Sequence, residues 1–142
     1  MKKESNCNFC DKKFEYCDSQ QTGKWCSNKC QMTAQYKTYI NKWKQGHVDG
    51  NTGKYGLSSH IRRYLFDKHD SSCSKCGWNK KNPVTGKVPL HVDHKDGDSK
   101  NNLESNIQLL CPNCHSLTPN FGILNKGNGR YLKNDAVHPS KK

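Results

Sequence analysis

Histidine, aspartate and cysteine residues gather between residues 73 and 115 at spacings that suit metal chemistry. Two Cys-x2-Cys pairs bracket the sequence His-Val-Asp-His at 91–94, and the second pair runs directly into His115. Four thiolates are a preferred tetrahedral set for Zn²⁺, whereas one carboxylate and one imidazole leave most positions on a divalent ion open. The segment therefore predicts a structural zinc site beside a group suited to metal-assisted hydrolysis. The predicted zinc ligands are Cys73, Cys76, Cys111 and Cys114.

Two short strands and two helices are expected to position these side chains. A helix is predicted after Ser58, which can cap it. Residues 89–94 and 107–110 are predicted strands, and the turn-rich segment 95–105 is predicted to be an ordered loop between them. Pro112 suits the first turn of a helix that carries Cys114 and His115. Strand, loop, strand and helix form a ββα unit.

The predicted site makes two demands on this unit. Neighbouring residues on a helix point about 100° apart, so Cys114 can face the zinc while His115 faces the strands. Adjacent residues of an ideal strand point to opposite faces, so Asp93 and His94 share one site only if the chain turns at His94. The sequence Lys-Asp-Gly-Asp at 95–98 supplies that turn.

The sequence Pro-Leu-His-Val-Asp-His-Lys-Asp-Gly-Asp at 89–98, together with Asn-Asn-Leu-Glu-Ser-Asn-Ile-Gln-Leu-Leu-Cys-Pro-Asn-Cys-His at 101–115, resembles the HNH (ββα-metal) endonucleases. Within them, it is most similar to the zinc-clamped enzymes common in bacteriophages. The resemblance covers about residues 57–130. It implies metal-dependent hydrolysis of DNA phosphodiesters, by nicking or double-strand cleavage, that leaves 5′-phosphate and 3′-hydroxyl ends. The implied catalytic ion is Mg²⁺ or Mn²⁺.

The same resemblance implies a role for each residue of the central group. His94 matches the general base, and Asp93 and His115 match the two ligands of the catalytic ion. Asn106 matches the asparagine that pins the loop and so holds His94. A neutral imidazole suits proton abstraction from water near pH 7, where carboxylates are too weakly basic and lysine is protonated. His91 shares a strand face with Asp93 by alternation and could touch substrate or serve the structure.

Several of these polar residues have a second interpretation. His115 follows a cysteine ligand directly, so it could replace one sulfur at the zinc. Asp96 and Asp98 suit a turn-forming loop, although they could also contact the catalytic ion through water. Asn101 and Asn102 are expected to be turn residues.

A second set of cysteines precedes the central group and predicts a second four-thiolate zinc site. Its members are Cys7, Cys10, Cys26 and Cys30. A helix is predicted after Ser27 and extends to about Lys44, and the whole pattern resembles the treble-clef or zinc-ribbon modules attached to nucleases. The ninth cysteine, Cys17, is expected to be a spare thiol, although it could replace Cys26 as a ligand.

Charge and composition indicate the class of partner. The chain has 24 basic and 12 acidic residues and a formal net charge of +12. Two sites of four thiolates around Zn²⁺ would reduce this to about +8, which still suits a polyanion such as DNA. Only 31% of the residues are hydrophobic, so a thin core needs metal cross-links. The candidate DNA contacts are Arg62, Arg63, Lys126 and Arg130.

The sequence excludes other surroundings and partners. No apolar run approaches the roughly 20 residues that span a membrane, and no signal peptide opens the chain. The cysteine pairs therefore favour metal over disulfides, and we expect a cytoplasmic protein of a bacterial host, encoded by a phage. A monomer or homodimer without a small-molecule substrate is expected.

The expected fold class is small α+β. The predicted divisions are a zinc-binding module at 1–45, a linker at 46–56, a ββα-metal nuclease domain at 57–118 and a basic extension at 119–142 whose end is disordered. A non-catalytic zinc module that regulates nucleic acid would explain the charge and the cysteines equally well. It would leave the grouping of Asp93, His94 and His115 unexplained. A zinc-stapled protein-interaction module would explain neither the charge nor that grouping.

Overall fold

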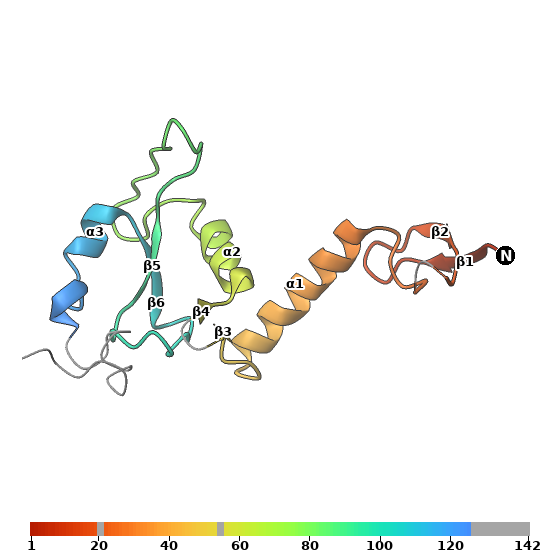
Figure 1. Ribbon diagram of the computed structural model, residues 1–142, viewed down its shortest axis with the longest axis horizontal. Helices are drawn as coiled ribbons and strands as arrows, with labels where there is room; N and C mark the ends of the chain where they lie inside the picture. Colours follow the sequence, from red (N-terminus) through yellow and green to blue (C-terminus); the bar gives the residue numbers. More distant parts are fainter. Residues whose placement is uncertain (20–21, 54–55, 126–142) are drawn as a thin grey trace, which may run out of the picture. The chain divides into compact units, whose positions relative to one another are not determined.

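The computed structural model describes residues 1–19, 22–53 and 56–125 (Figure 1). The chain divides into two compact units, one of residues Met1–Lys42 and one that begins at Trp43. Each unit combines short antiparallel strands with helix, so the protein is small α+β. Lys126, Arg130 and most of the expected extension at 119–142 lie outside the described residues.

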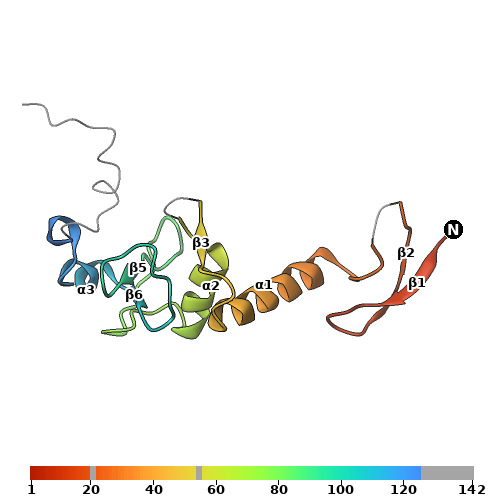
Figure 2. The ribbon, with the colours of Figure 1, turned by 90° about the horizontal axis from the view of Figure 1, so that it is seen from below.

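The N-terminal unit pairs a hairpin with a helix (Figure 2). Strand β1 (Lys3–Asn6) pairs antiparallel with β2 (Lys13–Tyr16), and helix α1 (Asn28–Lys44) follows. The helix begins where the sequence predicts, because the Ser27 hydroxyl accepts a hydrogen bond from the Cys30 backbone N–H at 3.2 Å and caps the first turn. The hairpin was not predicted. Its signal is the alternation of exposed and half-buried residues along β2, at Phe14 and Tyr16.

The second unit is built on one antiparallel strand pair, β5 with β6. Helix α3 contacts both strands and α2 contacts β6, so the two helices flank the pair (Figure 1). The strand predicted at 107–110 and both predicted helices are confirmed, and the strand predicted at 89–94 forms over 91–94. The elements of this unit are β3 (Asn51–Thr52), β4 (Gly56–Leu57), α2 (Ser59–Lys68), β5 (His91–His94), β6 (Ile107–Leu110), α3 (Pro112–Ser116) and the short 3₁₀ helix η1 (Gly122–Leu124).

Helix α2 shows why the local sequence folds as predicted. The Ser58 side chain accepts a hydrogen bond from the His60 backbone N–H, which satisfies one of the free donors of the first turn. Ile61 and Leu65 lie four residues apart and are 0% and 1% exposed, so one face of the helix is fully buried. Arg62 and Arg63 stay exposed beside them.

The core of the second unit is small and contains metal-ligand candidates. Four buried aliphatic side chains are packed with two cysteines, and four partly buried residues cover them. Burial of so few apolar groups contributes little free energy of folding, so we expect metal cross-links to contribute to the stability of this unit. The buried members are Cys73, Val88, Leu90, Leu109, Leu110 and Cys111, and the covering residues are Phe66, Trp78, Val92 and Cys114.

The described residues of the expected linker at 46–56 include Gly50, which packs against α2. Strand β3 pairs with β4, and the Ser58 backbone N–H donates to the Gly50 carbonyl at 2.9 Å. Gly50 has φ of 78° and lies so close to Ile61 that a Cβ there would collide with the isoleucine Cδ1. Only glycine meets both conditions at this position.

The long loop between β5 and β6 is tied to the helices through Glu104. Its carboxylate accepts hydrogen bonds from the Tyr64 hydroxyl at 2.6 Å and the Lys68 ammonium at 2.7 Å, with the Lys44 ammonium at 3.9 Å. The indole N–H of Trp43 donates to the backbone carbonyl of Asn102 at 2.9 Å. The loop is therefore held against α2 and against Trp43, within the second unit.

Across the described parts of the chain, no helix combines the length and the apolar character that crossing a bilayer requires.

We predict that Glu104→Gln destabilises the protein in a pH-dependent way. Hydrogen bonds from Lys68 and Tyr64 hold the pKa of Glu104 below its ordinary 4.5. The stabilisation is therefore fully present above pH 4.5 and is lost as the pH falls through the lower folded pKa. Denaturant unfolding near pH 7 should show a loss of about 1 kcal/mol relative to wild type, shrinking on acidification.

Glu15→Gln is the matched control, because the Glu15 carboxylate makes only an exposed ion pair with Lys2 at 3.1 Å. An equal loss in the two variants near pH 7 would contradict a special role for Glu104.

Candidate active site

A cavity of about 370 Å³ opens where β5, the following loop and α3 meet. The three residues that the sequence singles out for chemistry, Asp93, His94 and His115, all line it. The turn expected after His94 is present, since the Gly97 backbone N–H donates to the His94 carbonyl at 2.9 Å. The complete lining is His91, Val92, Asp93, His94, Gly97, Ser99, His115, Asn120 and Asn125.

Asp93 and His115 face each other across this cavity. Asp93 is 7% exposed, and its Oδ1 lies 3.6 Å from His115 Nε2. Its other oxygen, Oδ2, accepts a 2.7 Å hydrogen bond from Gln108 Nε2, and Gln108 is its direct partner across the strand pair. An ion bonded to both atoms at about 2.1 Å would hold them about 3.0–3.5 Å apart at angles of 90–110°. The observed pair needs only a slight closure to fit a divalent ion.

The pair leaves most of such an ion's coordination sphere open. Within residues 1–19, 22–53 and 56–125, only the two cysteine groups bring three or more ligand atoms within 4.8 Å of one another. Asp93 and His115 would therefore be two ligands without a third, as a site that binds water and substrate oxygens requires.

Aromatic packing holds the His115 ring in place. The ring centroid lies 5.0 Å from that of His91 and 5.2 Å from that of Phe121, the latter edge-on at 87°. Burial lowers the pKa of His91, and the neighbouring charges of His115 and Arg62 lower it further. His91 is therefore neutral near pH 7.

Two residues that hold the site were not singled out from the sequence. Neither Gln108 nor Phe121 has a local sequence signal, since each contacts a residue of another element.

His94 makes its side-chain contact with a residue that the sequence assigns to a turn. His94 Nε2 lies 2.8 Å from Asn102 Oδ1, and Asn102 is only 2% exposed. Expecting Asn102 to be merely a turn residue was therefore incomplete, because it is buried and bonded to the candidate base. Asn102 is the buried residue among three asparagines of this loop, and nothing in the local sequence distinguishes it from half-buried Asn101 and Asn106.

Asn106 braces the loop from within. Its Nδ2 donates to Asp96 Oδ1 at 2.9 Å and to the Asn101 carbonyl at 2.8 Å, and its Oδ1 accepts from the Asp96 N–H at 3.2 Å. Burial raises the pKa of Asp96, but hydrogen bonds from Asn101, Asn106 and the Asp98 N–H outweigh it and bring the pKa below its ordinary value. The Asp96 carboxylate is thus engaged in forming the loop.

Polar groups able to meet a substrate border the cavity. The Ser99 hydroxyl oxygen is buried and has no hydrogen-bond partner among the described residues. Arg62 on α2 is exposed and close enough to His91 to lower its pKa. Arg63 is exposed as well, with its Nε 3.7 Å from Asp67.

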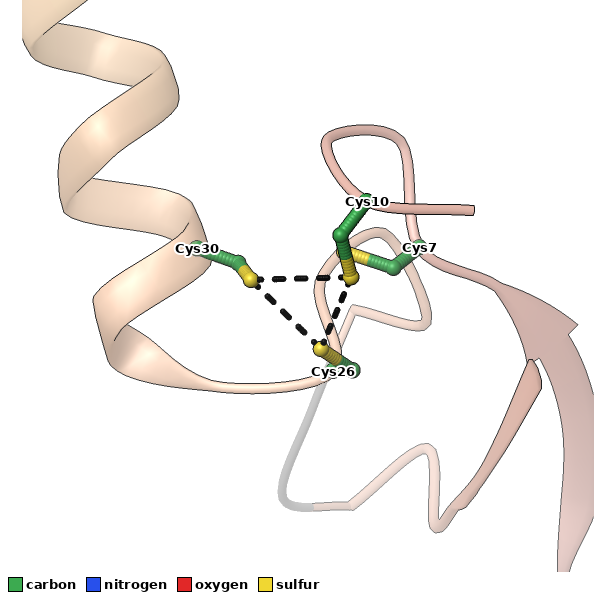
Figure 3. A group of neighbouring side chains, drawn as sticks. All are labelled: Cys7, Cys10, Cys26 and Cys30. Carbon is green, nitrogen blue, oxygen red and sulfur yellow. Dashed lines mark hydrogen bonds between the residues drawn. The ribbon is translucent and has the colours of Figure 1, made fainter. Parts of the chain in front are cut away.

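Two groups of four cysteines have the dimensions of tetrahedral metal sites. In the N-terminal unit three sulfur pairs, Cys10–Cys26, Cys26–Cys30 and Cys30–Cys10, are 3.6, 3.6 and 3.8 Å apart (Figure 3). In the second unit Cys76 and Cys111 are 3.8 Å apart. A zinc ion with Zn–S bonds of about 2.3 Å places its sulfurs about 3.8 Å apart. The groups are Cys7, Cys10, Cys26, Cys30 and Cys73, Cys76, Cys111, Cys114.

The Cys-x2-Cys knuckles that begin at Cys7 and at Cys73 have the same backbone form. In the first, the Cys7 N–H donates to the Lys12 carbonyl and the Asp11 N–H to the Cys7 carbonyl, both at 2.9 Å. In the second, the Cys73 N–H donates to the Trp78 carbonyl at 2.9 Å and the Gly77 N–H to the Cys73 carbonyl at 2.8 Å. The residue after each second cysteine is left-handed, with φ of 58° and 75°.

Backbone hydrogen bonds favour the thiolate at the first cysteine of each group, whereas hydrogen bonds from the nearby cysteines and burial raise the pKa of Cys26 and of Cys114 to about 12. Burial raises the pKa of Cys73, yet backbone N–H groups of Cys111, Cys76 and Lys75 outweigh it and lower the pKa to about 6. Cys7 has the same balance, with its pKa lowered to about 6. Thiolates are the form that binds metal, so the chemistry of both groups fits zinc.

The sequence left two alternatives for the ligands. Cys17 lies outside both groups, with its Sγ 3.2 Å from Ser19 Oγ, whereas Cys26 belongs to the first group. His115 lies outside the second group, which consists of cysteines alone. The side chains of Cys114 and His115 therefore diverge from α3 as the helical spacing requires.

Comparison with known proteins connects this site to a family. Residues 73–120 match the HNH endonuclease family. The chain is 35% identical over 104 residues to H-N-H endonuclease F-TflIV of Escherichia phage T5, an alignment covering 68% of this chain and 42% of that protein. It is 31% identical over 85 residues to Zorya protein ZorE of Escherichia coli, covering 59% of this chain and 22% of that protein. The chain thus spans less than half the length of these relatives. No solved structure matches it.

We predict that Cys111→Ser removes one metal ion and unfolds the second unit. Zinc binding at such a group contributes directly to folding, by about 10–16 kcal/mol in small zinc domains, so losing one ligand leaves the thin core unsupported. Elemental analysis of the purified protein should show zinc falling from about two ions per chain to about one, with loss of cooperative unfolding.

Cys17→Ser provides the control, because Cys17 belongs to neither group. It should keep both zinc ions and the wild-type melting curve. A folded Cys111→Ser protein that retains both ions would show that the sulfur of Cys111 is not a ligand.

Proposed function

Because residues 73–120 belong to the HNH endonuclease family, we propose that this protein is a metal-dependent DNA endonuclease that hydrolyses phosphodiester bonds. The observation that carries the proposal is the convergence of Asp93, His94 and His115 on one cavity. We assign β5, β6 and α3 as the ββα-metal unit of this nuclease.

His94 is the proposed general base. It lines the cavity and is hydrogen-bonded to a buried neighbour, so its ring has a defined orientation. Its proposed task is to take the proton from the water that attacks the phosphorus, a task that suits imidazole near neutral pH. Asn106, which braces the loop after β5, is the proposed support for that orientation.

Asp93 and His115 are the proposed ligands of the catalytic ion. Gln108 engages one oxygen of Asp93 and leaves the other towards His115. A divalent ion held there, Mg²⁺ or Mn²⁺ in this proposal, would supply electrostatic stabilisation to the charge that develops on the phosphate and the leaving 3′-oxygen. Cleavage would leave 5′-phosphate and 3′-hydroxyl ends. A single site of this kind cuts one strand per encounter.

DNA is the proposed substrate because the charge distribution suits a polyanion. The net charge of +12 favours phosphate contacts, and Arg62 and Arg63 lie exposed on the helix beside the cavity strands. The location of action, in this proposal, is the cytoplasm of a bacterial host.

The two cysteine groups are the proposed structural zinc sites. The first makes residues 1–45 a small zinc module of treble-clef or zinc-ribbon type, with Cys30 on the first turn of α1 (Figure 3). The second joins the knuckle at Cys73 to the start of α3, which carries His115. Both sites hold shape in this proposal and take no part in hydrolysis.

We predict that His94→Ala abolishes metal-dependent nicking of supercoiled plasmid. Loss of a general base should slow cleavage by about 10²–10⁴-fold, measured with Mg²⁺ or Mn²⁺ and with chelator as the blank. His47→Ala is the control, because His47 is exposed and lies outside the cavity lining. Equal cleavage by wild type and His94→Ala would refute the assignment. DNA binding without any cleavage by wild type would favour the non-catalytic regulator.

We predict that Asp93→Asn removes cleavage while DNA binding persists. The amide keeps an acceptor for Gln108 but no longer offers a negative oxygen beside His115, so affinity for the ion falls. Plasmid nicking at fixed Mg²⁺ should drop at least about 100-fold. Gel-shift affinity for the same DNA without metal should stay within about twofold, since no phosphate-binding cation is lost. Loss of affinity with an intact melting curve would place Asp93 in the binding surface instead.

A further inference from the structure

We propose that Asn102 is a positioning residue that fixes the tautomer and orientation of His94. It does so at the end of a hydrogen-bond chain that runs from the Lys100 backbone carbonyl through Asn51. This proposal rests on the proposed function in one respect, since that function gives His94 its task as a general base. The hydrogen bonds themselves stand independently of that task.

The direction of every hydrogen bond in this series follows from the Lys100 carbonyl, where the series begins. A backbone carbonyl can only accept, so Asn51 must present its Nδ2 to Lys100 O, 3.4 Å away. The other side-chain atom of Asn51, Oδ1, then accepts from Asn102 Nδ2 at 3.0 Å. This leaves Asn102 Oδ1 as the atom facing the histidine.

An acceptor at that place determines where the imidazole proton lies. Asn102 Oδ1 is 2.8 Å from His94 Nε2, a distance at which the nitrogen must donate. A neutral imidazole carries one ring proton, so Nε2–H leaves Nδ1 with the lone pair. The structure thus assigns Nδ1 as the atom of His94 that can accept a proton from water.

Packing prevents Asn102 from reversing this order. Asn102 is 2% exposed, and the Trp43 indole N–H donates to the backbone carbonyl of Asn102 at 2.9 Å. Trp43 is itself 5% exposed. Asn51 is held in turn by the pairing of β3 with β4, opposite Leu57. A flipped Asn102 amide would place its NH₂ against His94 and its oxygen against the oxygen of Asn51, leaving two buried acceptors facing each other.

These hydrogen bonds also give a role to the close packing of Gly50 and Asn51 against the loop after β5. Gly50 lets the backbone approach so closely that a Cβ there would lie 3.2 Å from Asn102 Cβ. That approach brings the next residue, Asn51, within reach of Asn102. Asn102 thus contacts His94, while Asn51 and Trp43 hold Asn102 in place.

The test compares the tautomer of His94 in the full-length, zinc-loaded protein by ¹⁵N NMR of its imidazole. The His94 signals are identified from their absence in His94→Ala, at a pH where the ring is neutral. Wild type should show a single Nε2–H tautomer. Asn102→Ala removes the acceptor and should show both tautomers. Asn51 is less buried than Asn102, so Asn51→Ala serves as a second variant in case Asn102→Ala does not fold. It removes the hydrogen-bond partner that orients the Asn102 amide and should also show both tautomers.

Asn101→Ala is the matched control. Asn101 is the adjacent loop asparagine, and its Nδ2 donates to Asp96 Oδ2 at 2.6 Å without contacting His94. Loosening the loop in this way should leave the tautomer unchanged. A single Nε2–H tautomer in folded Asn102→Ala or Asn51→Ala, or the same mixture in Asn101→Ala, would overturn the proposal.

Kinetics then separate positioning from binding. In the plasmid assay Asn51→Ala should lower kcat about 10- to 100-fold, the range for losing a partner that orients a functional imidazole, and leave KM within about twofold. Because the NMR comparison needs no cleavage, an inactive wild type would refute the nuclease and leave the tautomer assignment to be decided by the spectra. A raised KM with unchanged kcat would refute the positioning role.

Discussion

Four cysteine sulfurs meet in the second unit, and the zinc ion proposed there would contribute more to its stability than the small apolar core. Cys111 shows why: it directly follows β6, it belongs to the buried core, and its Sγ accepts from the Cys114 N–H at 3.4 Å as the N-cap of α3. A zinc ion bound through this residue, as proposed, would hold the strand pair, the helix and the knuckle at Cys73 together. Four buried aliphatic side chains could not define these relationships alone. The close match of the sulfur spacing to a zinc tetrahedron gives that cross-link its physical basis.

The cavity is assembled from side chains that are each held by a separate device. Gln108 engages one oxygen of Asp93 across the strand pair, and the rings of His91 and Phe121 confine His115. Asn102 reaches His94 from the loop. Each candidate functional group is therefore oriented before any ligand binds. Such preorganisation is what electrostatic and general-base catalysis require of a site.

The same knuckle is used twice in the chain, once in each unit. In both, the residue after the second cysteine adopts a left-handed conformation, and its backbone N–H donates to the backbone carbonyl of the first cysteine. Asp11 and Gly77 occupy that position, which shows that the turn accepts a side chain where solvent surrounds it. The two units thus share a means of holding metal, while only the second has the HNH match and the cavity.

The extent of sequence prediction depended on whether a feature is local. Cysteine spacing, the cap at Ser58, the strand at 107–110 and the helix start at Pro112 are encoded within a few residues, and all of them could be predicted. The short strands β1 to β4 were missed because they are only two to four residues long and none of their residues is fully buried, so burial leaves little pattern.

The partners of the chemical groups come from elsewhere in the chain. Asn51 meets Asn102 across 51 residues, Trp43 meets it across 59, and Gln108 meets Asp93 across 15. The sequence alone predicts a general base, two ligands of a catalytic ion and two four-cysteine zinc sites. Only folding decides which nitrogen of His94 is free and which oxygen of Asp93 is open, because a hydrogen bond depends on ångström-scale positions that no local spacing encodes.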